Sequence, residues 1–434
     1  MSNRNDYDYF DLDNFDDGYD SRDYRRRQPE RRQGSYNKRP TYNSGRRRPP
    51  KRNNKRTRNR IIIILSGILI LVVLILILSA IFKGCGNNPE QTSASVSTET
   101  IAPSTVAATN DTASSNPSNT DELSSTYFKT PKIEDDGTNG TMVYNIYVWK
   151  NVAYELFGST EEKAKTYADT INGFADKFGS DVKVYDMVVP NHTEMGLPQR
   201  LKDGEAQSSS QMENIKSIYA NLSDKVTPVN CYNYLADHNG EYIYFNSDHH
   251  WTGLGAYYAY TAFAKTTDQA VLSLENCTEK QVEGFTGSFA NSASGLESDT
   301  VHYWEFPYEV SMDITYDDGT VGTYDSPYYQ YAEGGSNTYG VFVMGDNALT
   351  VLKSQSESAT AGKKIAVVKE SYGNAFVPYL TNNYEEVHVV DFRYFGQNLV
   401  NYCSENGITD VLFLNGVMSA NTQIQLDSMS GLFN

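Results

Sequence analysis

The string of residues 248–251, Asp-His-His-Trp, places two of the six histidines of the chain directly beside a carboxylate. In an extended segment, residues i and i+2 point to the same side of the backbone. Asp248 and His250 are therefore expected to share one side, while His249 points elsewhere. A carboxylate beside an imidazole fixes the tautomer of the ring and stabilises the imidazolium that forms during proton transfer. The spacing predicts that His250 is a general base and that Asp248 orients it.

Two other interpretations of this string stay open. Asp248, His249 and His250 are also good metal ligands, and His192 is a further ligand type elsewhere in the chain. Adjacent histidines seldom bind one ion together, and no third cluster of ligands is evident. In a purely structural interpretation the string is a loop with Trp251 as its aromatic anchor.

A general base needs a nucleophile, and Ser371 is the best candidate. It follows the predicted buried strand of residues 364–368, which is apolar from residue 365 onward, and Gly373 then permits a tight turn before a predicted helix. A strand-to-helix turn exposes a hydroxyl and brings helix-start N–H groups near an oxyanion. The sequence around Ser371 is not GxSxG. The alternative role for a serine in such a turn is a helix cap.

Predicted strands and helices alternate around these residues. This alternation predicts an α/β domain with a mainly parallel central sheet. Residues 280–350, rich in Tyr, Thr, Gly and Asp, predict a β-rich antiparallel insertion. The predicted strands are 143–148, 182–189, 242–245, 364–368, 386–390 and 410–414, and the predicted helices are 161–178, 211–222, 252–265, one from about 374, and 397–405.

The chain of 434 residues is divided by composition. Residues 1–60 carry 18 Lys and Arg against 9 Asp and Glu, whereas the remainder carries 19 against 45. Residues 1–60 predict a disordered basic cytoplasmic tail, because they have too few apolar side chains to fold alone. Residues 61–82 are apolar and uncharged, and predict one transmembrane helix. Residues 83–126 predict a Ser/Thr-rich flexible stalk, and residues 127–434 a single folded extracytoplasmic domain.

The basic residues before the apolar run predict a cytoplasmic N-terminus. The C-terminal domain would then lie outside the cell, anchored to the cell membrane by a single span. The basic run itself is interpreted as a topology signal next to the membrane rather than as a binding site for anionic lipid or nucleic acid. The four cysteines, Cys85, Cys231, Cys277 and Cys403, are too few for a disulfide framework. One bridge or buried free thiols are both compatible with them.

Together, the Asp248–Trp251 string and the Ser371 segment resemble the DHHW family of bacterial surface proteins. That family is similar to the SGNH-like domains of the alginate O-acetyltransferase proteins. The resemblance covers roughly residues 140–434. Its supporting segments are 186–190, 345–347, 369–380, 391–394 and 409–412.

The resemblance implies an SGNH-hydrolase-like domain with Asp248 as the orienting acid, His250 as the base and Ser371 as the nucleophile. His249 falls at the variable position of the motif. Glu370 precedes the nucleophile, where Asp is more usual in SGNH sequences. The residues expected to line the substrate site are Arg393, Asn374, Asn415 and Trp251.

The resemblance also implies an activity. The expected function is O-acetyl transfer to a cell-surface or exported polysaccharide through a Ser-His-Asp triad. Its alternatives are a carbohydrate acetylesterase with the same triad and a non-catalytic surface or scaffold protein that keeps the fold. A multipass membrane O-acyltransferase is the implied partner, and no cofactor or metal is implied.

Overall fold

The computed structural model of the protein describes residues 123–316 and 318–434. The predicted basic tail, the apolar run of residues 61–82 and nearly all of the predicted stalk lie outside the described residues. Within the described part, no helix is both long and apolar enough to cross a membrane. The folded domain predicted from residue 127 onward falls inside the described part.

The core of the domain is one eight-stranded sheet with the strand order β5-β4-β13-β11-β12-β10-β8-β9. The pairs from β5 to β12 are parallel, and the pairs from β12 to β9 are antiparallel. The strands, in sheet order, are β5 (Val226–Pro228), β4 (Lys183–Val189), β13 (Asp410–Gly416), β11 (Thr360–Lys369), β12 (Tyr384–Asp391), β10 (Leu349–Ser354), β8 (Val310–Thr315) and β9 (Val321–Tyr324).

This mixed sheet corrects the prediction of a mainly parallel sheet. Part of the region predicted as a separate insertion, β8 and β9, extends the central sheet through β10. Buried and half-buried residues alternate along β8, so that one face of the strand packs on the core and the other faces outward. This pattern lets β8 join the central sheet. Hydrophobic periodicity identifies such a strand but does not say which sheet it joins.

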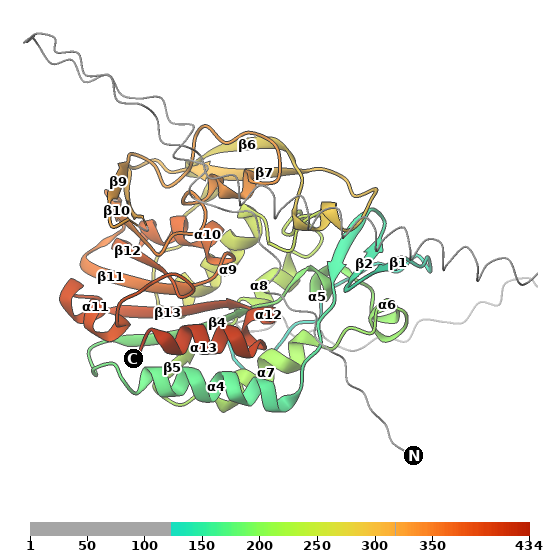
Figure 1. Cartoon of the computed structure of the whole chain (residues 1–434), viewed down its shortest axis with the longest axis horizontal. Coiled ribbons are helices and arrows are strands. Elements are labelled where there is room, and N and C mark those ends of the chain that lie inside the picture. Colours follow the sequence, from blue (N-terminus) through green and yellow to red (C-terminus); the bar gives the residue numbers. More distant parts are fainter. Residues whose placement is uncertain (1–122, 317) are drawn as a thin grey trace, which may run out of the picture. The chain divides into compact units, whose positions relative to one another are not determined.

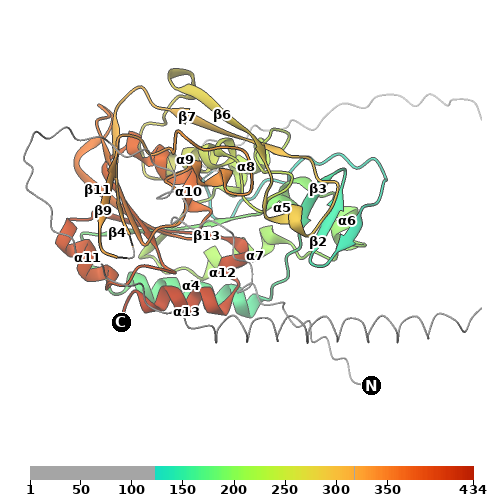
Figure 2. The same ribbon diagram turned by 45° about the horizontal axis from the view of Figure 1, so that its top comes forward.

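Helices cover both faces of the sheet (Figures 1 and 2). Helices α4 and α13 lie along one face, and α9 and α10 lie on the other. Helix α4 begins where the sequence predicts, because the Thr160 side chain accepts a hydrogen bond from the Lys163 N–H. The helices are α4 (Glu161–Ala175), α5 (His192–Gly196), α6 (Gln199–Asp203), α7 (Gln211–Asn221), α8 (Tyr232–Asp237), α9 (Gly253–Thr266), α10 (Gly373–Phe376), α11 (Leu399–Asn406), α12 (Val417–Ala420) and α13 (Gln423–Gly431).

Two small antiparallel sheets flank this core. Strands β1 (Thr141–Val143), β2 (Ile146–Trp149) and β3 (Val152–Glu155) form one, and β6 (Thr278–Phe285) and β7 (Asp299–Glu305) form the other. The single strand predicted over residues 143–148 is a hairpin, because the chain turns at Tyr144, whose φ of 55° is left-handed.

The parallel strands fix the location of the site. The carboxyl ends of β4, β13, β11 and β12 meet at one edge of the sheet, where open α/β sheets present their functional loops. The three described cysteines, Cys231, Cys277 and Cys403, are free thiols.

Candidate active site

Asp248, His250 and Ser371 form one hydrogen-bonded chain. The Ser371 Oγ lies 2.8 Å from the His250 Nε2, and the His250 Nδ1 lies 2.6 Å from the Asp248 Oδ1. All three side chains are buried. Because a carboxylate only accepts hydrogen bonds, the His250 Nδ1 carries the proton, and the Nε2 lone pair faces the Ser371 hydroxyl. This is the geometry that a serine nucleophile and its base require.

The Asp248 carboxylate is held on both oxygens. Its Oδ1 accepts from the His250 backbone N–H as well as from the ring, and its Oδ2 accepts from the Ser288 N–H at 2.7 Å. Burial alone raises the pKa of Asp248, but the electrostatic attraction of the His249 and His250 rings and these hydrogen bonds outweigh it and hold the pKa well below its usual range. Asp248 therefore stays ionised beside the imidazole.

The loop that carries Asp248 is fixed by a second carboxylate, Asp299 at the start of β7. Its oxygens accept from the backbone N–H groups of Asn246 and Ser247, both at 2.8 Å. Gly287 lies against the same loop, where an added Cβ would come within 2.3 Å of the Asp248 Cβ. Only glycine allows the approach that brings the Ser288 N–H to Asp248.

The nucleophile turn is held to the neighbouring strand by Glu370. One carboxylate oxygen accepts from the Tyr372 N–H at 2.9 Å, and the other accepts from the Gly416 N–H at 2.8 Å, at the end of β13. The Ser371 hydroxyl lies 3.3 Å from the same carboxylate, farther than from His250. The longer Glu side chain at this position thus spans two strand ends and supports the turn.

Aromatic rings enclose the imidazole of His250. The Tyr339 ring stacks on it with centroids 4.1 Å apart and an interplanar angle of 13°. The Tyr339 hydroxyl also donates to the Ser371 carbonyl at 3.2 Å, and the Trp251 indole N–H donates to the Tyr372 carbonyl at 2.9 Å. These contacts hold the His250 ring and the turn at Ser371 in place.

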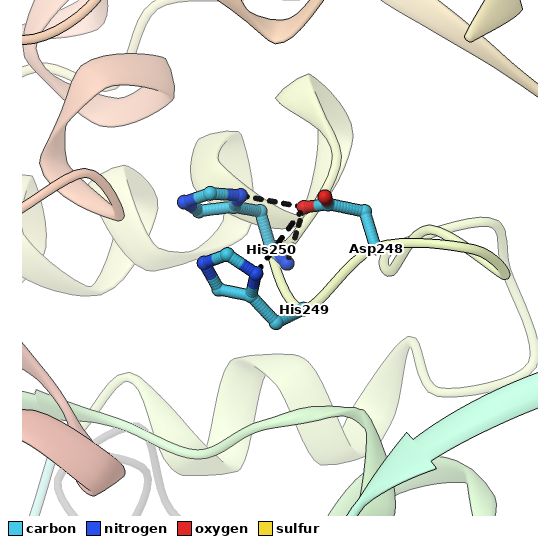
Figure 3. A group of neighbouring side chains, drawn as sticks. All are labelled: Asp248, His249 and His250. Carbon is cyan, nitrogen blue, oxygen red and sulfur yellow. Dashed lines mark hydrogen bonds and ion pairs between the residues drawn. The ribbon is translucent and has the colours of Figure 1, made fainter. Parts of the chain in front are cut away.

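The His249 ring lies next to that of His250, and its Nδ1 is 3.8 Å from the Asp248 Oδ1, outside hydrogen-bond distance (Figure 3). Its ring centroid is 3.8 Å from that of His250, and its Nδ1 is 2.8 Å from the Ser288 Oγ. Asp248, His249 and His250 offer ligand atoms within 4.8 Å of one another, which is close enough for a metal ion. However, both oxygens of Asp248 and both ring nitrogens of His250 already serve the hydrogen-bonded chain. The geometry fits proton transfer better than metal binding.

The further candidate metal ligand, His192, is not part of this group. Its ring stacks on Tyr244 with centroids 5.2 Å apart, and its Nδ1 lies 3.2 Å from the Phe245 carbonyl oxygen. Burial lowers the pKa of His192 to about 4, so the ring is neutral. His192 is a packing residue of the core.

A cavity of about 140 Å³ opens beside the Ser371 hydroxyl. Of the four residues expected to line a substrate site, Arg393 lies on its wall. The other three are buried behind it: Trp251 supports the nucleophile turn, Asn374 donates to Asp346, and Asn415 donates to Tyr167. The cavity walls include Glu155, His249, Glu370, Arg393 and Met418.

Arg393 is held by a buried group of charges. Its guanidinium lies 2.7 Å from carboxylate oxygens of both Asp346 and Asp391, and Lys369 pairs with the same two carboxylates at 2.9 and 2.8 Å. Two cations and two anions thus balance one another at the ends of β11 and β12. Such a group is stable when buried only because every charge has a partner.

Sequence reasoning missed Asp299, Ser288, Tyr339 and Glu155. All four come from segments far from the two motifs along the chain, and none stands in a recognisable pattern. Asp299 and Ser288 lie in the region predicted as a β-rich insertion, which in fact supports the loop of Asp248.

The DHHW protein family matches the chain over residues 101–390, more than half of its length. The chain belongs to the DHHW family. A DHHW family protein from Eubacterium siraeum has a similar structure, with a TM-score of 0.62 and 29% identity, covering 68% of this chain and 99% of its own. No curated protein matches the chain.

Two more distant solved structures are also similar to this chain. Bacillus cereus PatB1, solved with a sulfonyl adduct, has a TM-score of 0.53 and 18% identity, and the match covers 63% of this chain and 94% of PatB1. At this identity the likeness shows the fold alone. The O-acetyltransferase domain of Pseudomonas putida AlgJ is a weaker match, with a TM-score of 0.35 and 12% identity over 68% and 98% of the two chains.

Proposed function

We propose that this DHHW protein is an O-acetyltransferase that uses Ser371 as its nucleophile and acts on a cell-surface or exported polysaccharide. The observation that carries the proposal is the buried chain of hydrogen bonds from Asp248 through His250 to the Ser371 hydroxyl, which opens into a cavity. A structural helix cap would need neither an imidazole at 2.8 Å nor an ionised carboxylate behind it.

The proposed reaction has two steps. The Ser371 Oγ attacks the carbonyl carbon of an acetyl donor while His250 takes the hydroxyl proton at Nε2. The imidazolium, stabilised by Asp248, then protonates the leaving group, and an acetyl-serine remains. In the second step a sugar hydroxyl attacks this ester, its proton passes through His250 to the Ser371 Oγ, and the acetylated sugar leaves.

Two further parts of the proposal concern the partner protein and the location of the folded domain. The acetyl donor would be presented by a multipass membrane O-acyltransferase, the partner that the alginate O-acetyltransferase resemblance implies. Residues 1–60 carry a net positive charge, whereas the rest of the chain carries a net negative charge. This contrast supports an extracellular location for the folded domain.

Covalent labelling tests the nucleophile directly. Sulfonyl fluorides react with activated hydroxyl groups, and the PatB1 structure carries a sulfonyl adduct. We expect residues 127–434 to gain the mass of one sulfonyl group, with the label on the peptide that contains Ser371. Ser371→Ala should remain unlabelled, whereas Ser358→Ala, at an exposed serine, should label like the unmodified protein.

Turnover of p-nitrophenyl acetate separates the candidate activities. Acetyl transfer predicts p-nitrophenol release that accelerates when an oligosaccharide acceptor is added, with an acetylated product seen by mass spectrometry. Release into water alone, unaffected by acceptors, identifies an esterase. Equal rates for the unmodified protein and Ser371→Ala would refute both activities and leave a scaffold role.

A further inference from the structure

A carboxylate, Glu155, faces the cavity on the wall that also carries Ser371 and His249. It is the last residue of β3, and the backbone around it is fixed on both sides. The Ala153 N–H donates to the Asn246 carbonyl at 2.9 Å, and the Leu156 N–H donates to the Asn145 carbonyl at 3.1 Å. The small β1–β3 sheet therefore delivers this side chain to a defined place beside the nucleophile.

The Glu155 carboxylate has no cationic partner among residues 123–316 and 318–434: no lysine, arginine or histidine there forms an ion pair with it. Burial and the neighbouring carboxylates of Asp248 and Glu370 raise the pKa of Glu155, whereas His249 and a hydrogen bond from Asn191 act in the opposite direction. The side chain is half-buried, and a ligand that supplies a positive charge would favour its ionised form.

Apart from His249, the cationic side chains near the cavity are already paired with carboxylates. Arg393 and Lys369 are each engaged by Asp346 and Asp391. Glu370 accepts two backbone N–H groups and forms no ion pair within the part of the chain that the structure describes. With Asp248 ionised as well, the surroundings of the Ser371 hydroxyl carry excess negative charge.

This distribution of charge discriminates between acceptor sugars. Because like charges repel and opposite charges attract strongly in a partly desolvated cavity, an anionic sugar is repelled there and a cationic one is attracted. A uronate or a sugar phosphate would bring a further anion beside Glu155. An ammonium group on the sugar would instead complete an ion pair and donate hydrogen bonds to the carboxylate.

We propose that the acceptor is a glycan that carries free amino groups, and that Glu155 binds the ammonium group of the sugar whose hydroxyl is acetylated. This inference rests on the proposed transferase function and names its substrate class. The hydroxyl of that sugar attacks the acetyl-serine carbon, the bond to the Ser371 Oγ breaks, and the hydroxyl proton returns through His250 to the Ser371 Oγ. Glu155 takes no part in the proton transfer and sets the specificity.

The test is binding rather than turnover, so that it does not depend on an acetyl donor. Calorimetry on Ser371→Ala compares three probes of equal length: a de-N-acetylated chito-oligosaccharide, its fully N-acetylated counterpart and an oligogalacturonate. At about pH 6 the amine is charged, since an ordinary α-amino group has a pKa near 7.7. We expect the amine-bearing probe to bind at least about tenfold more tightly than the N-acetylated probe, and the uronate to bind most weakly.

Two variants in the Ser371→Ala background decide the role of Glu155. Glu155→Gln should abolish the preference for the amine-bearing probe, whereas Glu357→Gln, at an exposed glutamate, should preserve it. If Glu155→Gln does not fold, raised salt serves instead, because the preference should shrink as the ion pair is screened. A preference that survives Glu155→Gln or high salt, tighter binding of the uronate, or no binding of any probe overturns the inference.

The outcome is independent of the test of the proposed function. Release of p-nitrophenol with no preference for the amine-bearing probe overturns the substrate class alone. A clear preference without any p-nitrophenol release leaves Glu155 as a binding residue and overturns the transferase.

Discussion

Replacing Asp248 with asparagine exchanges one carboxylate oxygen for an NH₂ group and leaves the volume of the side chain nearly the same. The carboxylate uses one oxygen for the two donors of His250 and the other for the Ser288 N–H. An amide has only one acceptor oxygen. The asparagine side chain in Asp248→Asn must therefore turn its NH₂ group either toward the His250 ring or toward the Ser288 N–H.

Each orientation has a definite cost. With the NH₂ toward His250, the ring adopts the other tautomer, its Nε2 carries the proton, and it no longer accepts from the Ser371 hydroxyl at 2.8 Å. The equivalent change in a Ser-His-Asp triad lowers kcat by about 10⁴, which corresponds to about 5.5 kcal/mol. Either orientation also sets two buried donors against each other, the NH₂ and the His250 backbone N–H in the first, and the NH₂ and the Ser288 N–H in the second, at a cost of about 1–3 kcal/mol of stability. We expect the first orientation to dominate, because the His250 N–H lies at 3.0 Å and the Ser288 N–H at 2.7 Å, and activity to fall by about 10⁴.

The assay is the initial rate of p-nitrophenol release, together with the melting temperature. The predicted result for Asp248→Asn is near-complete loss of activity in a protein that still folds, with a melting temperature lowered by about 2–10 °C. Activity within about tenfold of the unmodified protein would show that Asp248 does not set the tautomer of His250, and the interpretation of the hydrogen-bonded chain would be wrong.

Two further predictions concern positions that support this chain or lie away from it. Gly287→Ala places a Cβ within 2.3 Å of the Asp248 Cβ, so we expect about 1–3 kcal/mol of destabilisation and a loss of activity, measured by urea unfolding and p-nitrophenol release. The control is Gly173→Ala in α4, where an added Cβ meets nothing within 4 Å and should stabilise slightly; equal stability of the two variants contradicts the prediction. Burial raises the pKa of Asp186 to about 7, so the folded chain keeps a proton that the unfolded chain has lost above about pH 4. The free energy of unfolding should therefore fall by about 1.4 kcal/mol per unit as the pH rises between those values, and Asp186→Asn should remove the slope. Denaturant titrations across this range measure it, and an unchanged slope in the variant counts against the prediction.

The folded domain shows how far local patterns reach. Helix α4 and strands β4 and β13 follow the predicted ranges closely, because their apolar residues recur with helical or buried-strand spacing. The helix predicted from about residue 374 is short, with α10 ending at Phe376 and a 3₁₀ turn following. Pro378 explains this, since it has no N–H to continue the helix.

The mixed sheet shows where local patterns stop. Strand β10 runs antiparallel to β12, and β8 and β9 follow it in the same sheet. The apolar residues of each strand recur with the spacing typical of a strand, but the direction of the strand depends on how the long connections cross the sheet. Contacts between distant segments decide that direction, and no single segment predicts it.

By itself, the sequence determined which residues could do the chemistry: the spacing of Asp248 and His250 and the turn at Ser371 are local features. Only the tertiary structure decided that they meet, because the 2.8 Å contact joins residues that are 121 positions apart. It also decided that Arg393 faces the cavity while Asn374, Asn415 and Trp251 lie behind it. Finally, it placed Glu155 and Ser371 on the wall of one cavity. Glu155 ends a strand of a small sheet and Ser371 follows a strand of the central sheet. Their electrostatic interaction depends on their distance in space, which the sequence does not give.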